Sequence, residues 1–414
     1  MTNKKKIALL MGRGIEGCGV TKFSLEQLAW LINHGYAASI YAIVDKYWAQ
    51  NKAHDISNIH RVRFVKDGDV NSTIAALNEH DLIIINSLPS TEHPKECIDG
   101  FKRLLKEVKK PFVLIQHDHS MLSIKRNACI DEAIEASKLL FVHSPTNDFA
   151  EYVKENGGSG GLSSFMGEEE KVLLPFQPGL SFDPIRKKYW KDIKEQDVKH
   201  HKFIGRTTTW KGYFNMIDFH NDHLRAAGCL TTCEGLSRTP AFMTIKERNI
   251  EFEGNTQGGL NRIDTYDLSD KYGKPIQIFS SYSNERMLER MSRVGFGYQL
   301  SLFKSPKYIY RSLEYTHCEV VCTGVIPVFR KGYGDLCIHR KHGIPLTQCK
   351  NNGTVWLGEK GDTQAAMDLI MTLTNDSVMR NEWREQAYEF YRDHQDAEYT
   401  FEELTNTIMK EIKL

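Results

Sequence analysis

The chain has 414 residues, with 54 basic and 53 acidic side chains and a formal net charge of +1 at pH 7. This length predicts two or three domains, each able to bury a core, and excludes a single small module. With 41% hydrophobic and 10% aromatic residues the composition is that of a globular protein, and the balanced charge excludes a disordered acidic or basic tail protein. Any contact with nucleic acid must therefore come from local patches.

The sequence contains no apolar run near the roughly 18 residues that span a bilayer, so no membrane partner is expected. Lys4–Lys6 followed by Ile7–Met11 is too short for a signal peptide. Nine cysteines, an odd number in a long chain, indicate reduced thiols rather than a disulfide framework. These features together predict a cytoplasmic protein.

The first part of the chain alternates apolar runs with helical patterns. Strands are expected at 6–11, 39–44, 61–65, 81–86, 111–116, 138–143 and 171–175. Helices are expected at 22–33, 93–108, 124–136 and 146–155. The alternation predicts a doubly wound α/β domain over residues 1–180, with its ligand edge at the carboxyl ends of the strands. The Gly- and Ser-rich segment 156–164 is interpreted as a surface loop without chemistry.

A charged, irregular stretch predicts a linker at 181–200, and a second α/β pattern follows over 201–382. Its expected strands are 202–205, 229–233, 250–253, 275–279, 297–301, 325–329 and 355–357. Its expected helices are 212–225, 284–293, 308–318 and 363–374. Residues 383–414 are predicted to be helical and long enough to cross back onto the first domain. Two doubly wound domains in tandem suggest a ligand in the cleft between them.

The first turn, Gly12–Gly17, reads Gly-x-Gly-x-x-Gly directly after a strand, and Asp45 ends the second expected strand. This pattern is typical of dinucleotide binding, with the acid on a ribose. The following helix, from about Val20, presents a positive N-terminus that any anionic group can use. NAD binding, phosphate or sugar-nucleotide binding, and a plain tight turn all remain open on this motif alone.

The fifth expected strand ends at Gln116, and His117, Asp118 and His119 follow. In an extended chain the two histidines share a face, which permits a two-histidine metal site, but no third and fourth ligands are visible. Polar residues that merely rim a cleft are the alternative. A His-Asp pair at this edge also suits a sugar, since imidazole can hold a hydroxyl and carboxylate can face developing positive charge.

Two Cys-x-x-x-Cys pairs invite a zinc proposal. Cys229 and Cys233 lie in an expected strand, and Cys318 and Cys322 lie in a helical context. In such surroundings cysteine behaves as a small buried hydrophobe. We therefore expect no metal site at either pair.

The second domain opens with a cation, Arg206, after its first strand, and a second cation, Lys211, precedes the next helix. Two such cations can hold a diphosphate, although a solvated loop is the alternative. A later helix delivers Glu319 toward the turn at Gly324, where a carboxylate can accept both hydroxyls of a ribose. Together the three charged residues predict a nucleotide site.

The blocks 16–24, 116–120, 204–212, 287–301 and 311–317 resemble the DNA alpha-glucosyltransferases of T-even-type bacteriophages, which are retaining GT-B glycosyltransferases. The resemblance implies a GT-B fold and transfer of glucose from UDP-glucose to the 5-hydroxymethyl group of hydroxymethylcytosine in double-stranded DNA. It also implies an alpha-glucosidic bond, hence retention, and the cytoplasm of the infected bacterial host as location. The rival interpretations are an NAD-dependent enzyme built on the Gly12–Gly17 turn with Asp45, a non-enzymatic DNA-binding protein, and a GT-B enzyme with a small-molecule, protein or lipid acceptor.

The resemblance implies roles for individual residues. His117 and Asp118 are the expected catalytic residues. The expected UDP-glucose contacts are Gly17, Gly19, Val20, Arg206, Lys211, Arg311, Glu314 and Glu319. Many retaining GT-B enzymes carry a glutamate eight residues before the ribose glutamate, and here that position is Arg311. No metal or other cofactor is expected, because Arg206 and Lys211 can absorb the charge of the leaving group.

Chemistry on a base inside a duplex requires the nucleotide to leave the stack, so we expect DNA to approach from the edge at His117–His119. His119, Lys125 and Arg126 are the expected DNA contacts, the two cations acting on phosphate. The alternative phosphate contacts are Arg61, Arg63 and Lys66, or Arg186, Lys187 and Lys188.

Overall fold

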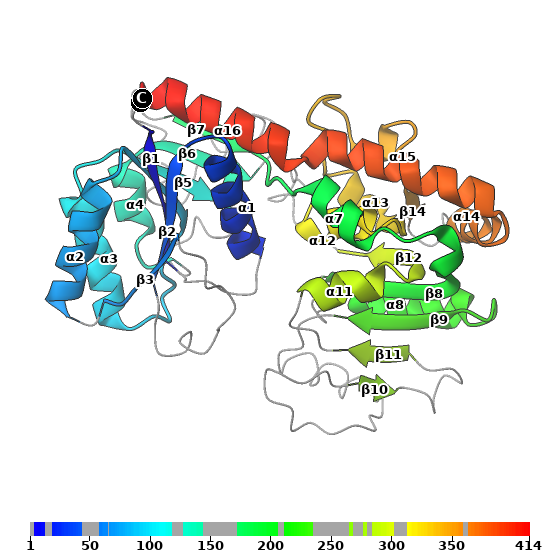
Figure 1. The fold of residues 1–414 in the computed structure, drawn as a ribbon. Helices are drawn as coiled ribbons and strands as arrows, with labels where there is room; N and C mark the ends of the chain where they lie inside the picture. The colour runs from blue at the N-terminus through cyan, green and yellow to red at the C-terminus, as the bar shows by residue number, and fades with distance from the viewer. Residues whose placement is uncertain are drawn as a thin grey trace. The chain divides into compact units, whose positions relative to one another are not determined.

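The computed structural model describes residues 4–12, 19–43, 58–64, 66–117, 127–143, 172–205, 211–234, 265–267, 276–279, 284–301, 313–358 and 363–414 (Figure 1). The chain divides into two compact units. Unit 1 consists mainly of Met1–Leu180 and Gln395–Leu414, and unit 2 mainly of Ser181–Ile309 and Leu313–His394. Each unit is built around one mainly parallel sheet, so the expected fold class, two doubly wound α/β units, is confirmed.

The sheet of unit 1 has the strand order β3-β2-β1-β4-β5-β6-β7, and every pairing is parallel. Its strands are β1 (Lys6–Met11), β2 (Ala37–Ile43), β3 (Ile59–Val62), β4 (Leu82–Ser87), β5 (Phe112–Gln116), β6 (Ser137–His143) and β7 (Val172–Phe176). The order reverses between β1 and β4. Ligands of such sheets bind outside the carboxyl ends of the strands near this reversal.

Helices cover both faces of the first sheet. They are α1 (Gly19–Asn33), α2 (Asp67–Asn78), α3 (Lys95–Glu107), α4 (Ile130–Ala136) and α16 (Ala397–Ile412). Figure 1 shows α2, α3 and α4 on one face, with α1 and α16 close to each other. Because both faces are covered, β1 is buried along almost its whole length. Helix α2 had no counterpart among the expected elements, since its apolar periodicity is interrupted by Asp and Asn.

The sheet of unit 2 has the strand order β10-β11-β9-β8-β12-β13-β14. Its strands are β8 (Asp197–Ile204), β9 (Leu230–Glu234), β10 (Thr265–Asp267), β11 (Ile276–Phe279), β12 (Val294–Gln299), β13 (Ile326–Arg330) and β14 (Val355–Leu357). Only β10 among the described strands of this sheet runs antiparallel to its neighbour. The order reverses between β8 and β12, which places the expected ligand edge beside Ile204 and Gln299.

The helices of unit 2 pack on both faces of its sheet. They are α7 (Phe182–Tyr189), α8 (Tyr213–Phe219), α11 (Asn284–Met291), α12 (Tyr315–Cys322), α13 (Lys331–Gly334), α14 (Thr363–Asn375) and α15 (Ser377–Gln395). Short turns add η2 (Ile193–Glu195), the π-helical segment η4 (His220–Leu224) and η6 (Leu346–Gln348). One core cluster joins the sheet to α8 and α14, and a smaller one joins it to α11 and α12.

Residues 181–200, for which the sequence suggested a linker, form α7, η2 and the first half of β8, and they cluster with unit 2. The last helix, α16, clusters with unit 1 and packs against α1. The chain enters α16 beside Leu180, whose N–H donates to the Gln395 carbonyl at 3.1 Å and whose carbonyl accepts from Ala397 N–H at 2.9 Å. Within the described ranges, no helix is long and apolar enough to cross a membrane.

Candidate functional site

The turn after β1 brings the backbone close to the segment that follows β4. Gly12 N–H donates to the Ser87 carbonyl at 2.7 Å, and a Cβ at Gly12 would stand 2.5 Å from Cδ of Pro89. Only glycine fits this approach. Helix α1 then begins at Gly19, and its first turn contains no acidic residue. No carboxylate in that turn therefore neutralises the positive end of the helix dipole. Gly19 is exposed and Val20 half-buried, as a ligand contact requires.

A buried polar network fixes the start of α1 on the sheet. The Ser24 hydroxyl donates to the Val20 carbonyl at 2.9 Å. The Asn86 amide, at the end of β4, donates to the Ser24 oxygen at 3.0 Å and to Oε1 of Gln27 at 2.9 Å. These residues are almost completely buried. The expected donor contacts Gly19 and Val20 therefore rest on a turn that is hydrogen-bonded to the strand next to β1.

His117 follows the carboxyl end of β5 and is half-buried. Its ring centroid lies 4.5 Å from that of Phe23 on α1 and 5.2 Å from that of Phe176 at the end of β7, both edge to face. Its Nε2 atom is buried. The structure thus brings His117 into direct contact with the helix that starts at Gly19.

In unit 2 the candidate site begins where β8 ends. Lys211 is buried and stands before Gly212, the N-cap of α8, which has φ 79°. A Cβ at Gly212 would collide with the carbonyl of Leu300, so this position requires glycine for both conformation and space. The Lys211 ammonium forms an ion pair with the Glu314 carboxylate. Their side chains are 10% and 24% exposed, so the pair is largely shielded from water.

Helix α12 carries the second half of this site. Glu314 is its N-cap residue, with extended backbone, and Glu319 lies inside the helix and is 3% exposed. Between them His317 is buried, stacked on Tyr333 at 4.9 Å and edge to face with Phe329 at 4.6 Å. Burial lowers the pKa of His317 to about 4, so it adds no charge beside Lys211 and Glu314 near neutral pH. The structure thus joins Lys211, Glu314 and Glu319 through one ion pair and one helix.

Two further polar residues lie at the same sheet edge and were not singled out from the sequence. Gln299 ends β12, is buried, and its amide donates to the Ile204 carbonyl at the end of β8. Ser301, two residues later, is completely buried. The sequence carried part of a signal, because both are polar residues at the end of an apolar strand, but the strand order that places them at the ligand edge appears only in the sheet.

Several predicted site residues lie outside the described part of the chain. They are Gly17, Asp118, His119, Lys125, Arg126, Arg206 and Arg311, together with Asp45 and the segment 156–164. Their proposed roles rest on the sequence.

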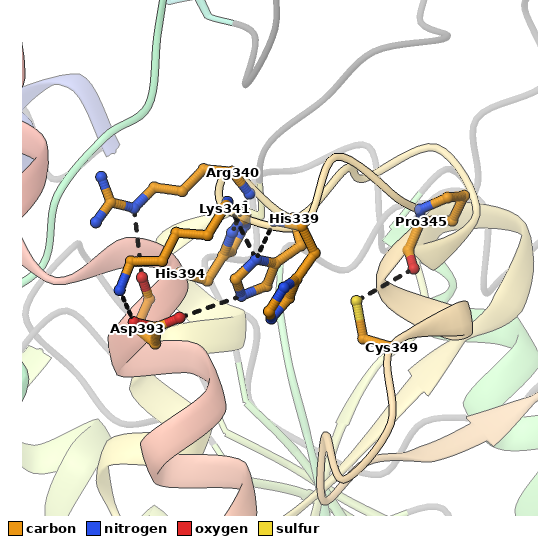
Figure 2. Close-up of polar contacts among 8 residues, drawn as sticks. His339, Arg340, Lys341, Pro345, Cys349, Asp393 and His394 are labelled. Atoms are coloured by element: carbon orange, nitrogen blue, oxygen red, sulfur yellow. Dashed lines mark hydrogen bonds and ion pairs between the residues drawn. The ribbon is translucent and has the colours of Figure 1, made fainter.

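The described residues contain one group with the ligand types of a metal site. Ligand atoms of His339, His342 and Asp393 lie within 4.8 Å of one another. However, Nδ1 of His339 accepts the N–H groups of Lys341 and His342, each at 3.3 Å, which leaves the proton of the neutral ring on Nε2. The Asp393 carboxylate pairs with the Lys341 ammonium (Figure 2). The Lys341–Asp393 pair fastens the turn onto the end of α15, and a metal bound by Asp393 and by Nε2 of His339 would have to displace that pair and the Nε2 proton.

The cysteines behave as the sequence predicts. All eight in the described ranges are free and buried. Burial raises the pKa of Cys233 to about 12 and also raises that of Cys229. Both side chains are buried, as the sequence predicts for cysteines that act as small hydrophobic residues.

Comparison with known proteins identifies the family. The family model described as DNA alpha-glucosyltransferase matches residues 18–378. The chain is 38% identical over 408 residues to the DNA alpha-glucosyltransferase of Enterobacteria phage T4, covering 98% of this chain and 100% of that protein.

Solved structures agree with this result. An alpha-glucosyltransferase in complex with UDP-glucose and DNA containing an abasic site matches with a TM-score of 0.84 at 36% identity, covering 98% of this chain and all of that one. Another, in complex with UDP and a 13-mer DNA containing an HMU base, has a TM-score of 0.83 at 37% identity, with the same coverage. Anabaena Alr3699/HepE, in complex with UDP and glucose, shares the fold at 12% identity, with a TM-score of 0.63 over 98% of this chain and all of that one.

The match extends through both units, and the two parallel sheets are those of the GT-B fold seen in these solved structures. The dinucleotide interpretation of the turn at Gly12 leaves the ion pair of Lys211 with Glu314 and the buried Glu319 unexplained. The chain therefore belongs to the DNA alpha-glucosyltransferase family.

Proposed function

We propose that this protein transfers glucose from UDP-glucose to the 5-hydroxymethyl group of hydroxymethylcytosine in double-stranded DNA, forming an alpha-glucosidic bond, in the cytoplasm of an infected bacterial host. The family match supports glucose transfer to DNA. The observation in the structure that favours a nucleotide-sugar donor is the joining of Lys211, Glu314 and Glu319 at the carboxyl edge of the second sheet.

In this proposal unit 2 binds the nucleotide. Glu319 accepts the ribose hydroxyls, and Arg206 with Lys211 holds the diphosphate, Arg as a fork and Lys as a point charge. Gly17, Gly19 and Val20 in unit 1 contribute backbone groups at the positive end of α1 to the donor. Arg311 and Glu314 complete the donor contacts. Lys211 already neutralises Glu314, so the diphosphate competes with that carboxylate for the ammonium.

The acceptor oxygen attacks the anomeric carbon on the face from which UDP departs, which retains the configuration. The bond from that carbon to the phosphate oxygen breaks, and its electron pair leaves with UDP. Asp118 accepts a hydrogen bond from the attacking hydroxyl and takes up its proton as the new bond forms, and His117 holds a sugar hydroxyl. The cations Arg206 and Lys211 stabilise the charge that develops on the leaving diphosphate.

Unit 1 is the proposed DNA side. The target nucleotide leaves the base stack to present its hydroxymethyl group, and His119, Lys125 and Arg126 contact the strand. Contacts to phosphate set the register of the protein on the duplex.

The test of this function uses UDP-glucose, labelled in the sugar, with two duplexes that differ only in carrying hydroxymethylcytosine or cytosine. Label is expected only in the duplex that carries hydroxymethylcytosine. After this duplex is digested to nucleosides, an alpha-specific glucosidase should release the labelled glucose. Release only by a beta-specific glucosidase would contradict retention. Transfer to free sugars or proteins instead of either duplex would favour the rival acceptor.

The catalytic roles are tested with His117→Ala and Asp118→Ala. Both variants should lose glucose transfer while keeping UDP affinity in calorimetry. Loss of UDP affinity in both would place these residues at the nucleotide and remove them from the acceptor side.

We also propose that the reaction needs no metal. A chelator should leave the rate unchanged, and His342→Ala, which removes one imidazole of the group formed by His339, His342 and Asp393, should do the same. A rate abolished by chelator and restored by one divalent metal would show that this part of the proposal is wrong.

A further inference from the structure

We infer that three aromatic rings in unit 1, those of Phe23, Phe176 and Phe401, position the His117 imidazole, and that the last helix of the chain thereby supports the proposed catalytic edge. Phe23 lies on α1, Phe176 at the end of β7 and Phe401 on α16. This inference rests on the proposed role of His117. It concerns residues that themselves touch neither substrate nor reacting atoms in the proposal, so they are positioning residues.

His117, Phe23 and Phe176 form a closed triangle of rings. The centroid distances are 4.5 Å from His117 to Phe23, 5.2 Å from His117 to Phe176 and 5.6 Å from Phe23 to Phe176. All three pairs are edge to face, with interplanar angles of 71°, 89° and 71°. This is the arrangement that aromatic quadrupoles favour, so each ring restricts the tilt of the other two.

The fourth ring connects the triangle to the C-terminal helix. The ring centroid of Phe401 lies 5.2 Å from that of Phe23, at an interplanar angle of 61°. The ring centroid of Trp30, further along α1, lies 6.5 Å from that of Phe401. Phe23 and Phe401 are completely buried, and Phe176 is 5% exposed. Phe401 therefore holds Phe23 from the side of α16, while Phe23 contacts the imidazole.

The triangle also links two parts of the proposed site. Phe23 follows Gly19 and Val20 by one turn of α1, and the Ser24 and Asn86 hydrogen bonds fix that turn. A shift of the α1 start therefore moves a ring that contacts His117. A donor bound at the start of α1 and a sugar hydroxyl held by His117 are in this way kept in one geometry.

The buried position of Nε2 gives the rings a specific task. Because Nε2 is buried, a sugar hydroxyl can reach only the other side of the imidazole, which carries Nδ1. The orientation of the ring plane then decides whether Nδ1 faces that hydroxyl. A misplacement of about 1 Å at a reacting group can reduce a rate by about a hundredfold. The triangle thus affects the rate of transfer more than the affinity for UDP-glucose.

The test compares Phe23→Leu with Phe101→Leu. Phe101 is an equally buried phenylalanine of unit 1 that belongs to the core on the α2–α4 side of the sheet instead of the ring triangle. Two quantities are measured, the kinetic constants for glucose transfer to hydroxymethylcytosine DNA and the proton and carbon shifts of the His117 ring, assigned by their loss in His117→Ala.

For Phe23→Leu we expect kcat to fall about tenfold or more with little change in KM for UDP-glucose, and the His117 ring shifts to move because a neighbouring ring current is lost. Phe101→Leu should leave both the ring shifts and the kcat of the folded protein unchanged. Phe401→Leu, which contacts Phe23 but not His117, should give a smaller change of the same kind and serves if Phe23→Leu fails to fold.

Unmoved His117 shifts in Phe23→Leu, or wild-type kcat despite moved shifts, would overturn the inference. Equal losses of kcat in Phe23→Leu and Phe101→Leu would also overturn it, because a general loss of packing would then explain both. A wild-type protein that transfers no glucose overturns the proposed function, and the ring shifts distinguish that failure, since they report the triangle without any turnover.

Discussion

Lys211 and Glu314 lie 103 residues apart and form an ion pair that joins the residue before the α8 N-cap to the N-cap of α12. The pair holds the ammonium beside the helix that carries Glu319. A buried ion pair is expensive to break by removing one partner, because the other charge is left uncompensated. The ammonium is therefore positioned before any donor arrives.

Removing this ammonium should impair donor use. We expect Lys211→Ala, like Arg206→Ala, to reduce kcat/KM for UDP-glucose by about a hundredfold, the scale for one charge-stabilising contact in a transition state. Lys199→Ala, at an exposed position on β8, is the matched control and should behave as wild type. Unaltered UDP affinity in calorimetry for both Lys211→Ala and Arg206→Ala would show that the diphosphate lies elsewhere.

The carboxylate of Glu319 should determine recognition of the sugar in the nucleotide. Glu319→Gln keeps the size of the side chain but removes its charge, so the variant should bind UDP more weakly and discriminate less against a deoxyribose donor. Glu289→Gln, an exposed acid that pairs with Arg293, is the control. If wild type and Glu319→Gln prefer UDP over its deoxy form by the same factor, Glu319 does not contact the ribose.

Phosphate contacts should appear as salt dependence. Neutralising Lys125 and Arg126 together should weaken DNA binding and reduce the log–log slope of affinity against salt by about one to two, while UDP affinity stays constant. The comparison variants neutralise Arg61, Arg63 and Lys66, which are exposed near the end of β3. If the salt dependence changes only when Arg61, Arg63 and Lys66 are neutralised, the DNA phosphates contact the protein near the end of β3.

Unit 2 should be sensitive to acid because it buries neutral histidines. Burial lowers the pKa of His201 to about 3 and that of His220 to about 4, from an ordinary value of 6.5. As the pH falls below 6.5, the two histidines are protonated in the unfolded chain while they remain neutral in the folded protein. The free energy of unfolding is therefore highest above pH 6.5 and falls as the pH drops toward 4. At pH 5 each such group can cost about 2 kcal/mol.

Urea unfolding followed by hydrogen exchange at about pH 7.5 and pH 5 measures this effect. The amides of β8 and β12 should lose protection at the lower pH before those of β1 and β4. His201→Gln, which retains a polar partner for the Tyr298 hydroxyl, should reduce the pH dependence, and the surface variant His34→Gln should not. Equal stability at the two pH values would contradict the prediction.

Local patterns in the sequence determined most of the elements. Short apolar runs predicted strands β1, β4, β5 and β14 within a residue or two of their observed ends, because a strand buried on both faces must be continuously apolar. The helix at Asp67–Asn78 and the helix inside the expected linker, Phe182–Tyr189, were missed. Both combine few apolar positions with many charged or polar ones, so their helical form depends on packing against neighbouring elements.

The chemistry of the site was also partly readable. Lys211 stood out because it follows Arg206 by five residues and precedes a helix, and Glu319 because its helix leads to the turn at Gly324. Gln299 and Ser301 were overlooked, although they end a strand next to the reversal of strand order. That reversal is a property of the sheet, and no local window of sequence contains it.

By itself, the sequence determined that the chain forms two α/β units, because strand and helix periodicities are local properties, and the blocks that resemble DNA alpha-glucosyltransferases indicated the family. Only the tertiary structure decided that Glu314 neutralises Lys211, that the ring of Phe401 on α16 packs on Phe23, and that the rings of Phe23 and Phe176 meet at His117. These contacts join residues up to hundreds of positions apart. Their energy depends on burial and ring orientation, which arise only when the strands have taken their order in the sheet.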